Sequence, residues 1–168
     1  NRVEVILPVY NESKVLKALF KAHPYEEVAY YLSNLENENQ DTGSGAVGEL
    51  EKEIEVYTFL DLLKNKFKAG IIRHTKPLKS AVKKVALCGG AGSFLLPKAI
   101  GAGADVYISA DFKYHEFFDA ENKIMIADIG HFESEQYTKE LLAEIISKKF
   151  TNIAVLLSGI NTNPVYYH

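Results

Sequence analysis

The sequence is poor in cysteine and has no excess of positive charge. Cys88 is the only cysteine among 168 residues, so no disulfide can form within the chain, which is compatible with a reducing cytoplasm. The formal net charge is −3, and there is no basic cluster with interleaved aromatic residues. The composition therefore gives no electrostatic reason to expect nucleic-acid binding.

The sequence also lacks a long apolar run. No segment is long enough to cross a membrane and no signal peptide is visible, so we expect a cytoplasmic protein. The chain starts without Met in a strand-like pattern, and we expect it to be a fragment or a processed product. Because 47% of the residues are hydrophobic, the chain can bury a core, in one large domain or two small ones.

Patterning before Pro77 predicts a ferredoxin-like unit. Hydrophobic periodicity predicts strands at about residues 2–9, 28–32, 46–56 and 70–74, a helix capped by Asn11 or Ser13, and a second helix capped by Thr58. The order β-α-β-β-α-β is that of a ferredoxin-like α+β domain. We therefore expect residues 1–76 to form the first domain.

From Pro77 onward the pattern changes to alternating strands and helices. Strands are predicted at residues 82–87, 106–109, 123–129 and 153–157, and helices before Gly101, at 114–122 and at 135–150. Such alternation predicts an α/β domain with a mostly parallel sheet and right-handed crossovers. Four strands make a thin sheet, so we expect this second domain, residues 77–168, to be completed by a part outside this chain.

A histidine and two carboxylates follow the predicted strand that ends at Ile129. They are His131, Glu133 and Glu135, at the carboxyl end of a strand, where open α/β sheets place their ligands. If a helix begins near His131, its side chain and that of Glu135 lie four residues apart on one face and can hold a metal ion between them. The alternative is a plain strand-to-helix turn in which Ser134 caps the helix.

The preceding predicted strand also ends in polar residues, namely Asp111, Lys113 and His115. Two neighbouring strands with His, Asp and Glu at the same edge of a sheet predict a functional site there. Asp111 and His115 are candidates for catalytic proton transfer in that site.

A glycine-rich turn joins the strand at 82–87 to the next helix. The backbone N–H groups of Gly89, Gly90 and Gly92 could bind an anion such as a phosphate. The turn lacks the Lys-Ser/Thr of a P-loop and is not a full dinucleotide fingerprint, so the alternative is a tight turn with close helix packing. Residues 23–27, His-Pro-Tyr-Glu-Glu, could also bind a metal ion or form a solvated loop.

Three motifs in the same order resemble the second half of the Nif-three-like family, whose members are often labelled GTP cyclohydrolase I type 2 homologues. The motifs are residues 87–93, 105–115 and 128–135. The first part of the chain resembles, through residues 23–30 and 45–50, the CutA-like (PII-like) domain that some members insert mid-chain. The resemblance implies an N-terminal CutA/PII-like ferredoxin-like domain followed by half of an α/β domain.

The same resemblance implies a site for two divalent metal ions, with His131 and Glu135 as ligands. Mixed nitrogen and oxygen ligands suit zinc, iron or manganese. The family's other ligands, a pair of adjacent histidines and an aspartate, come from its N-terminal half. This sequence has no His-His pair, so we expect the site to be incomplete here. Family members usually have a small residue where Glu133 stands, which leaves its role open.

The activity implied by the resemblance is that of a metal-dependent hydrolase, GTP cyclohydrolase-like, acting on a nucleotide or a phosphorylated small molecule. We expect this chain to be inactive by itself. The alternative is a non-catalytic metal-binding regulatory protein or protein-interaction scaffold. The resemblance also implies a homo-oligomer, typically a ring-shaped hexamer.

Overall fold

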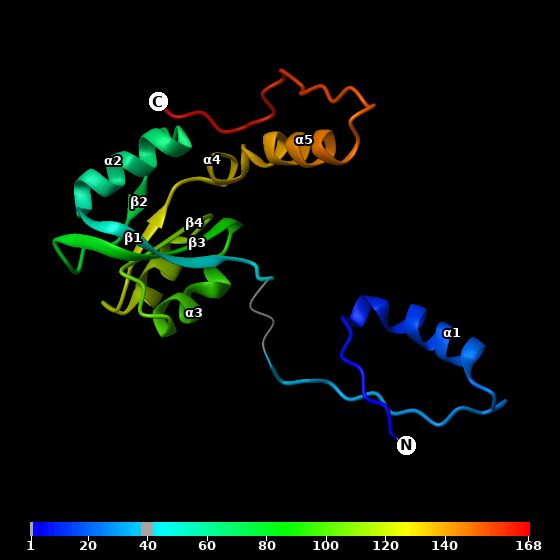
Figure 1. The fold of residues 1–168 in the computed structure, drawn as a ribbon. Helices are drawn as coiled ribbons and strands as arrows, with labels where there is room; N and C mark the ends of the chain where they lie inside the picture. Colours follow the sequence, from blue (N-terminus) through cyan, green and yellow to red (C-terminus); the bar gives the residue numbers. More distant parts are fainter. Residues whose placement is uncertain (1, 38–41) are drawn as a thin grey trace. The chain divides into compact units, whose positions relative to one another are not determined.

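The computed structural model describes residues 2–37 and 42–168 (Figure 1). The chain divides into two compact units, residues 1–39 and 40–168. The polar, glycine-containing residues 35–45 predict a loop, and part of this range lies outside the described residues.

The first unit is built around one helix. The 3₁₀ turn η1 (Val9–Asn11) leads into α1 (Glu12–Ala22), which confirms the helix predicted at this position. The Phe20 ring on α1 meets the Tyr30 ring edge-on, with 5.6 Å between ring centroids. Residues 2–8 and 28–32, predicted as strands, form no strand among the described residues, so the predicted ferredoxin-like unit is not seen there. An extended segment needs a paired neighbour to become a strand, and alternation in the sequence does not supply one.

The second unit contains a five-stranded mixed sheet with the order β1-β3-β4-β5-β2. Three parallel strands form its centre, at the positions that the sequence predicts: β3 (Ala81–Ala91), β4 (Val106–Ala110) and β5 (Met125–Asp128). The edges are antiparallel, with β1 (Ala46–Glu55) beside β3 and β2 (Arg73–His74) beside β5.

The sheet crosses the boundary predicted at residue 76. Both edge strands come from before Pro77, yet they pair with strands that follow it. Residue periodicity identifies a strand but not its partner, and these partners lie 26 or more residues away in the sequence. The chain divides near residues 38–41 instead, ahead of β1.

Helices cover both faces of the sheet, on opposite sides in Figure 1. On one face, α2 (Val56–Phe67) packs Phe59 and Leu63 against alternate residues of the central strands, such as Ile108. On the other face, α3 (Leu96–Gly101) packs on a cluster that includes Tyr107. Successive strand residues point to opposite faces, which explains the alternation of Tyr107 and Ile108. The N-cap of α2 is Glu55, which accepts a hydrogen bond from the Thr58 N–H, so Thr58 is not the cap.

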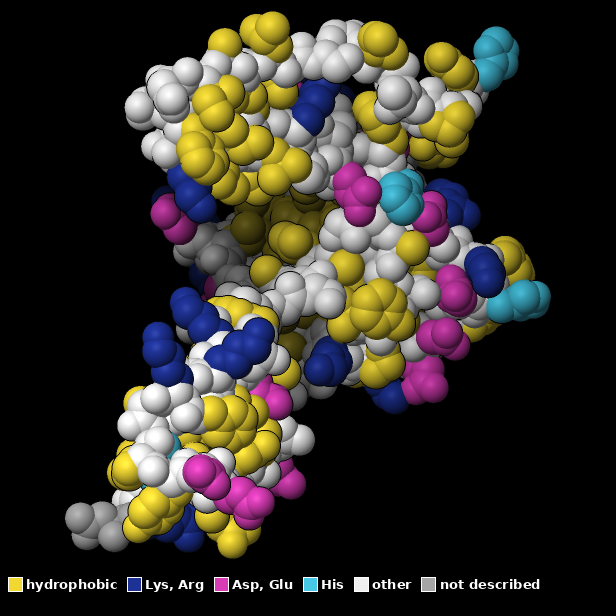
Figure 2. Space-filling view, turned by 90° about the vertical axis from the view of Figure 1, so that its right-hand side faces the viewer, with side chains coloured by type: hydrophobic (Ala, Val, Ile, Leu, Met, Phe, Trp, Pro, Cys, Tyr) yellow, Lys and Arg dark blue, Asp and Glu magenta, His cyan; other side chains and the backbone are white. Residues whose placement is uncertain are grey.

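The last predicted helix is confirmed and the last predicted strand is not. The helix predicted at residues 135–150 is α5 (Thr138–Lys149), which a short separate helix, α4 (His131–Glu135), precedes, and residues 153–157 are not a strand. The predicted apolar face of α5 remains at least partly exposed in the described chain, with exposed fractions from 39% at Ile146 to 57% at Leu141. Hydrophobic side chains gather over α5 and the segment that follows it (Figure 2). Within the part of the chain that the structure describes, no helix could span a membrane.

Asp105 ties the amino ends of β3 and β4 together. Its carboxylate accepts hydrogen bonds from the Lys83 and Lys84 N–H groups, at 2.9 and 2.8 Å, and from Lys79 Nζ at 2.6 Å. Burial raises the pKa of Asp105, but these hydrogen bonds lower it more, so the pKa lies below its ordinary value.

We expect Asp105→Asn to lower the free energy of unfolding by about 1–3 kcal/mol near neutral pH, because the strand N–H groups lose a charged acceptor. The depressed pKa contributes stability that is present above the unfolded-state pKa and is lost as the pH falls through the folded-state pKa. The loss caused by the substitution should therefore shrink in acid. Urea unfolding of the full-length protein at several pH values measures this, with Asp61→Asn on exposed α2 surface as the control. Equal losses for the two variants would contradict the prediction.

Candidate functional site

A cavity of about 560 Å³ lies at the carboxyl end of β5. Its walls come from four places: Ile71 and Arg73 at β2, Asp111 after β4, the β5–α4 turn with α4, and residues 163–167 near the end of the chain. A volume of this size is typical of sites for small molecules. The location is the sheet edge at which the sequence predicts a site.

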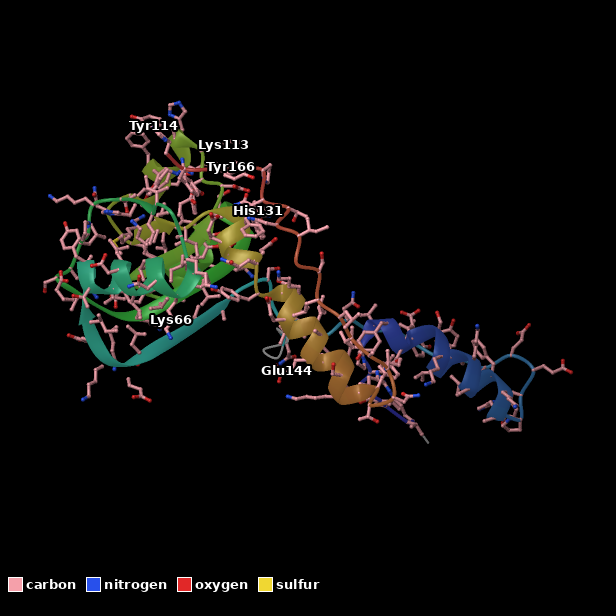
Figure 3. All side chains as sticks on the ribbon, turned by 90° about the horizontal axis from the view of Figure 1, so that it is seen from above. Lys66, Lys113, Tyr114, His131, Glu144 and Tyr166 are labelled. Carbon is pink, nitrogen blue, oxygen red and sulfur yellow. The ribbon has the colours of Figure 1, made fainter. Side chains whose placement is uncertain are left out.

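His131 begins α4 and lies between two carboxylates. Its Nδ1 is 2.6 Å from Asp111 Oδ2, and its Nε2 is 3.3 Å from Glu135 Oε2. The helix begins at His131, with Gly130 as its N-cap, so residues 131 and 135 share one face as predicted and Ser134 is not a cap. Figure 3 labels His131 on α4.

Asp111 reaches His131 from a strained backbone position. Its φ is 59°, in the left-handed region that aspartate tolerates better than most residues other than glycine. The hydrogen bond with Asp111 raises the pKa of His131 above its ordinary value of 6.5, and the charge of Glu135 acts in the same direction, against a smaller effect of burial. A carboxylate on Nδ1 fixes both the ring orientation and the tautomer of a histidine.

The glycine-rich segment predicted as a turn packs against α4. It is the last part of β3, which continues to Ala91, and only Gly92 follows the strand. The Gly90 N–H donates to Ser134 Oγ at 2.8 Å, and Ser109 Oγ donates to the Gly90 carbonyl at 3.0 Å. Gly90 has a φ of 63°, and a Cβ at this position would overlap the Glu135 carboxylate and come within 3.3 Å of His131 Cε1. The absence of a side chain at Gly90 thus has a steric reason. Gly89, Gly90 and Gly92 are not among the residues that line the cavity. Anion binding by this turn stays a prediction.

Asp128 and Arg73 are site residues that the sequence analysis missed. The buried Asp128 carboxylate accepts from the Phe112 N–H at 3.0 Å and the Gly130 N–H at 3.1 Å, and it forms an ion pair with Arg73. Asp128 ends an apolar strand, and a charged residue there, two residues before a glycine, is the signal that could have identified it.

The other predicted residues lie elsewhere. His115 belongs to the 3₁₀ helix η3 (Tyr114–Ala120), Lys113 directly precedes it, and neither residue lines the cavity. The His115 ring stacks on exposed Phe118 and meets the exposed Tyr114 ring edge-on. In the first unit, His23 Nδ1 accepts from the Tyr25 N–H at 3.2 Å. Across residues 2–37 and 42–168, no group of three or more His, Cys, Asp or Glu side chains could hold a metal ion.

Comparison with known proteins identifies the family. The sequence model of the family described as Duf34/NIF3 (NGG1p interacting factor 3) matches residues 10–164. The chain belongs to the Duf34/NIF3 family. This is the family that the three sequence motifs resemble.

Similar proteins are longer than this chain. A Bacillus subtilis (strain 168) protein named GTP cyclohydrolase 1 type 2 homolog is 34% identical over 168 residues, which cover 97% of this chain and 45% of that protein. A solved Bacillus cereus protein related to NIF3 is 33% identical, with a TM-score of 0.72 over 96% of this chain and 46% of its own. Staphylococcus aureus protein SA1388 is 26% identical, with a TM-score of 0.75 over 99% of this chain and 55% of its own. This Duf34/NIF3 chain thus spans about half the length of these relatives.

We expect Asp111→Asn to lower the pKa of His131 in the metal-free full-length protein, because Asp111 is the main cause of its elevation. A raised histidine pKa contributes stability that is fully present below the unfolded-state pKa and is lost as the pH rises through the folded-state pKa. The variant should therefore lose stability mainly at mildly acidic pH. NMR titration of the His131 ring measures the pKa, and exposed Asp119→Asn is the control. An unchanged titration would contradict the assignment.

We expect Gly90→Ala and Gly103→Ala to cost similar backbone free energy, about 1–2 kcal/mol, because both glycines have a positive φ. Only at Gly90 does the added Cβ meet a side chain, that of Glu135, whereas Gly103 has open space. Gly90→Ala should therefore move Glu135 away from His131 and lower the His131 pKa, and Gly103→Ala should not. The same NMR titration of the His131 ring measures the difference between the two variants. Identical titration curves for Gly90→Ala and Gly103→Ala would refute the close packing of α4 against Gly90.

Proposed function

We propose that His131 and Glu135 are part of a divalent-metal site, and that the full-length protein is a metal-dependent hydrolase of a nucleotide or a phosphorylated small molecule. The observation that supports this most directly is the arrangement of His131 between Asp111 and Glu135 at the edge of the cavity. A histidine ligand typically donates its second ring N–H to a carboxylate, as His131 can to Asp111.

The residues present fit part of a metal site. With the Nδ1 proton held by Asp111, Nε2 carries the lone pair and faces the Glu135 carboxylate at 3.3 Å. Two ligands that each lie 2.0–2.1 Å from a tetrahedral zinc ion are about 3.3 Å apart, so the pair has a separation suited to neighbouring ligands. Both side chains are about half exposed, at 52% and 51%, and can therefore accept an ion and further ligands.

The remaining ligands would come from outside this chain. Two ligands alone do not hold an ion tightly, and the described residues contain no third. The relatives extend well beyond the matched region. The family resemblance of the sequence motifs implies that an adjacent histidine pair and an aspartate lie in the half outside this chain. We propose that this half completes a site for two ions, which by ligand type would be zinc, iron or manganese.

When bound, the ions would supply Lewis acidity and a lowered pKa for water. The residues of this chain would prepare the site for that chemistry. Asp111 fixes the His131 ring, Asp128 holds the Gly130 N–H and thereby the start of α4, and the cavity receives the substrate. His115 does not line the cavity, so the proposal gives it no catalytic role.

A second candidate function is a non-catalytic metal-binding scaffold in the cytoplasm that assembles with copies of itself. It is favoured by apolar surface outside the cavity. Leu141 and Ile145 on α5, and Tyr114 and Phe118 on η3, are all more than half exposed in the described chain. Large exposed apolar patches are typical of protein–protein contacts.

We expect His131→Ala in the full-length protein to abolish stoichiometric metal binding, because the ion loses its nitrogen ligand from this chain. Elemental analysis of the purified protein measures metal content, and His74→Ala, an exposed histidine of β2, is the control. Unchanged metal stoichiometry in His131→Ala would refute the assignment. Nucleotide hydrolysis assays with the same metal then separate the hydrolase from the scaffold, since only the hydrolase turns over a nucleotide.

A further inference from the structure

The C-terminal strap, defined as residues 161–167, forms one wall of the cavity. Asn163, Pro164, Val165 and Tyr167 line it. Figure 1 shows the chain returning from the far end of α5 toward the end of α2. The strap has no regular secondary structure, but its turns are fixed by side chains: Asn161 Oδ1 accepts from the Asn163 N–H at 2.9 Å, and Asn163 Oδ1 accepts from the Val165 N–H at 3.0 Å.

Tyr167 holds the strap against the body of the unit. Its ring lies directly on Gly70, since a Cβ built on Gly70 would come within 2.5 Å of Tyr167 Cδ2 and 3.0 Å of Cγ. Glycine at position 70 therefore leaves the space that the ring occupies, 97 residues further along the chain. The adjacent Tyr166 is 86% exposed, whereas Tyr167 is 47% exposed, so only one of the two neighbouring tyrosines is docked.

The Tyr167 hydroxyl reaches the start of α4. A Cβ built on Gly130 would lie 3.1 Å from this hydroxyl and would overlap Glu133 Oε2, so both groups lie against Gly130. Glu133 is 94% removed from solvent, with a residue exposure of 6%, and it lies between His131 and Glu135 in the sequence. Burial raises the pKa of Tyr167, and the Glu133 charge acts in the same direction. The tyrosine hydroxyl thus lies near a buried carboxylate, and a hydrogen-bond donor close by favours such a burial.

We infer that Tyr167 is a positioning residue that latches the C-terminal strap between Gly70 and Glu133. The strap thereby encloses the site at α4 and slows the exchange of a bound ion with solvent. The latch itself rests on contacts within this chain, and the slowed exchange rests on the proposed function. The inference also assigns Glu133 a role: it anchors the latch and is not a ligand.

The latch is tested with a double-mutant cycle in the full-length protein, which requires no metal. Gly70→Ala should destabilise the protein when Tyr167 is present, because the new methyl group overlaps the ring. In a Tyr167→Ala background the same substitution should have little effect, which gives a coupling of about tenfold in the unfolding equilibrium constant. Gly159→Ala, where a Cβ meets nothing within 4 Å, is the matched glycine control. Additive effects of Gly70→Ala and Tyr167→Ala would overturn the latch.

Exchange at the site is tested by metal release to excess EDTA from the metal-loaded full-length protein. Tyr167→Ala should release metal about tenfold faster than the natural protein, because the strap opens more often, while metal stoichiometry stays the same. Tyr167→Phe keeps the ring on Gly70 and should restore most of the slow release, and Tyr166→Ala should change nothing. Equal release rates for Tyr167→Ala and Tyr166→Ala would overturn the enclosing role.

The two arms separate this inference from the proposed function. If the purified full-length protein carries no metal, the proposed function fails, and the double-mutant cycle still decides whether Tyr167 latches the strap. If the protein carries metal but the cycle shows no coupling, the latch fails and the metal site stands.

Discussion

The candidate site depends on one buried carboxylate, that of Asp128 at the end of β5. It receives the Phe112 N–H from the loop after β4 and the Gly130 N–H from the turn before α4, and it pairs with Arg73 on β2. Three separate segments are thereby held around one point. A buried carboxylate is tolerated only when hydrogen bonds and an opposite charge compensate it. The positions of its partners are therefore as restricted as that of Asp128 itself. The position of His131 follows from this arrangement, because α4 begins directly after Gly130.

Much of the site could be predicted from the sequence, because short segments of the chain determine where its side chains lie. Parallel strands end at the same edge, and two residues four apart share a helix face, so the meeting of Asp111, His131 and Glu135 follows from patterns within short segments. His115 shows the limit of this reasoning. It follows the same strand as Asp111, but η3 turns it toward Tyr114 and Phe118 and away from the cavity.

The parts that could not be predicted depend on contacts between distant segments. The sequence predicts strands at about residues 46–56 and 70–74 but not the strands with which they pair. The predicted domain boundary at residue 76 therefore falls within one sheet. The break at residues 136–137, which separates α4 from α5, was not predicted, and there Gln136 Nε2 donates to the Phe67 carbonyl at the end of α2. The contact between Gly70 and Tyr167 has no periodic signal at all, because a glycine that makes room for a ring looks like any other glycine.

The left-handed backbone at Asp111 restricts which amino acids can occupy that position on two independent grounds. The φ of 59° is tolerated best by glycine, asparagine and aspartate, whereas the bond to His131 Nδ1 requires a short side chain that ends in an acceptor. Glycine meets only the first demand, and glutamate meets neither, because its acceptor lies one methylene further from the backbone. Aspartate satisfies both with a negative charge, and asparagine satisfies both without one. The choice between these two residues therefore sets the charge beside the imidazole without altering the path of the main chain.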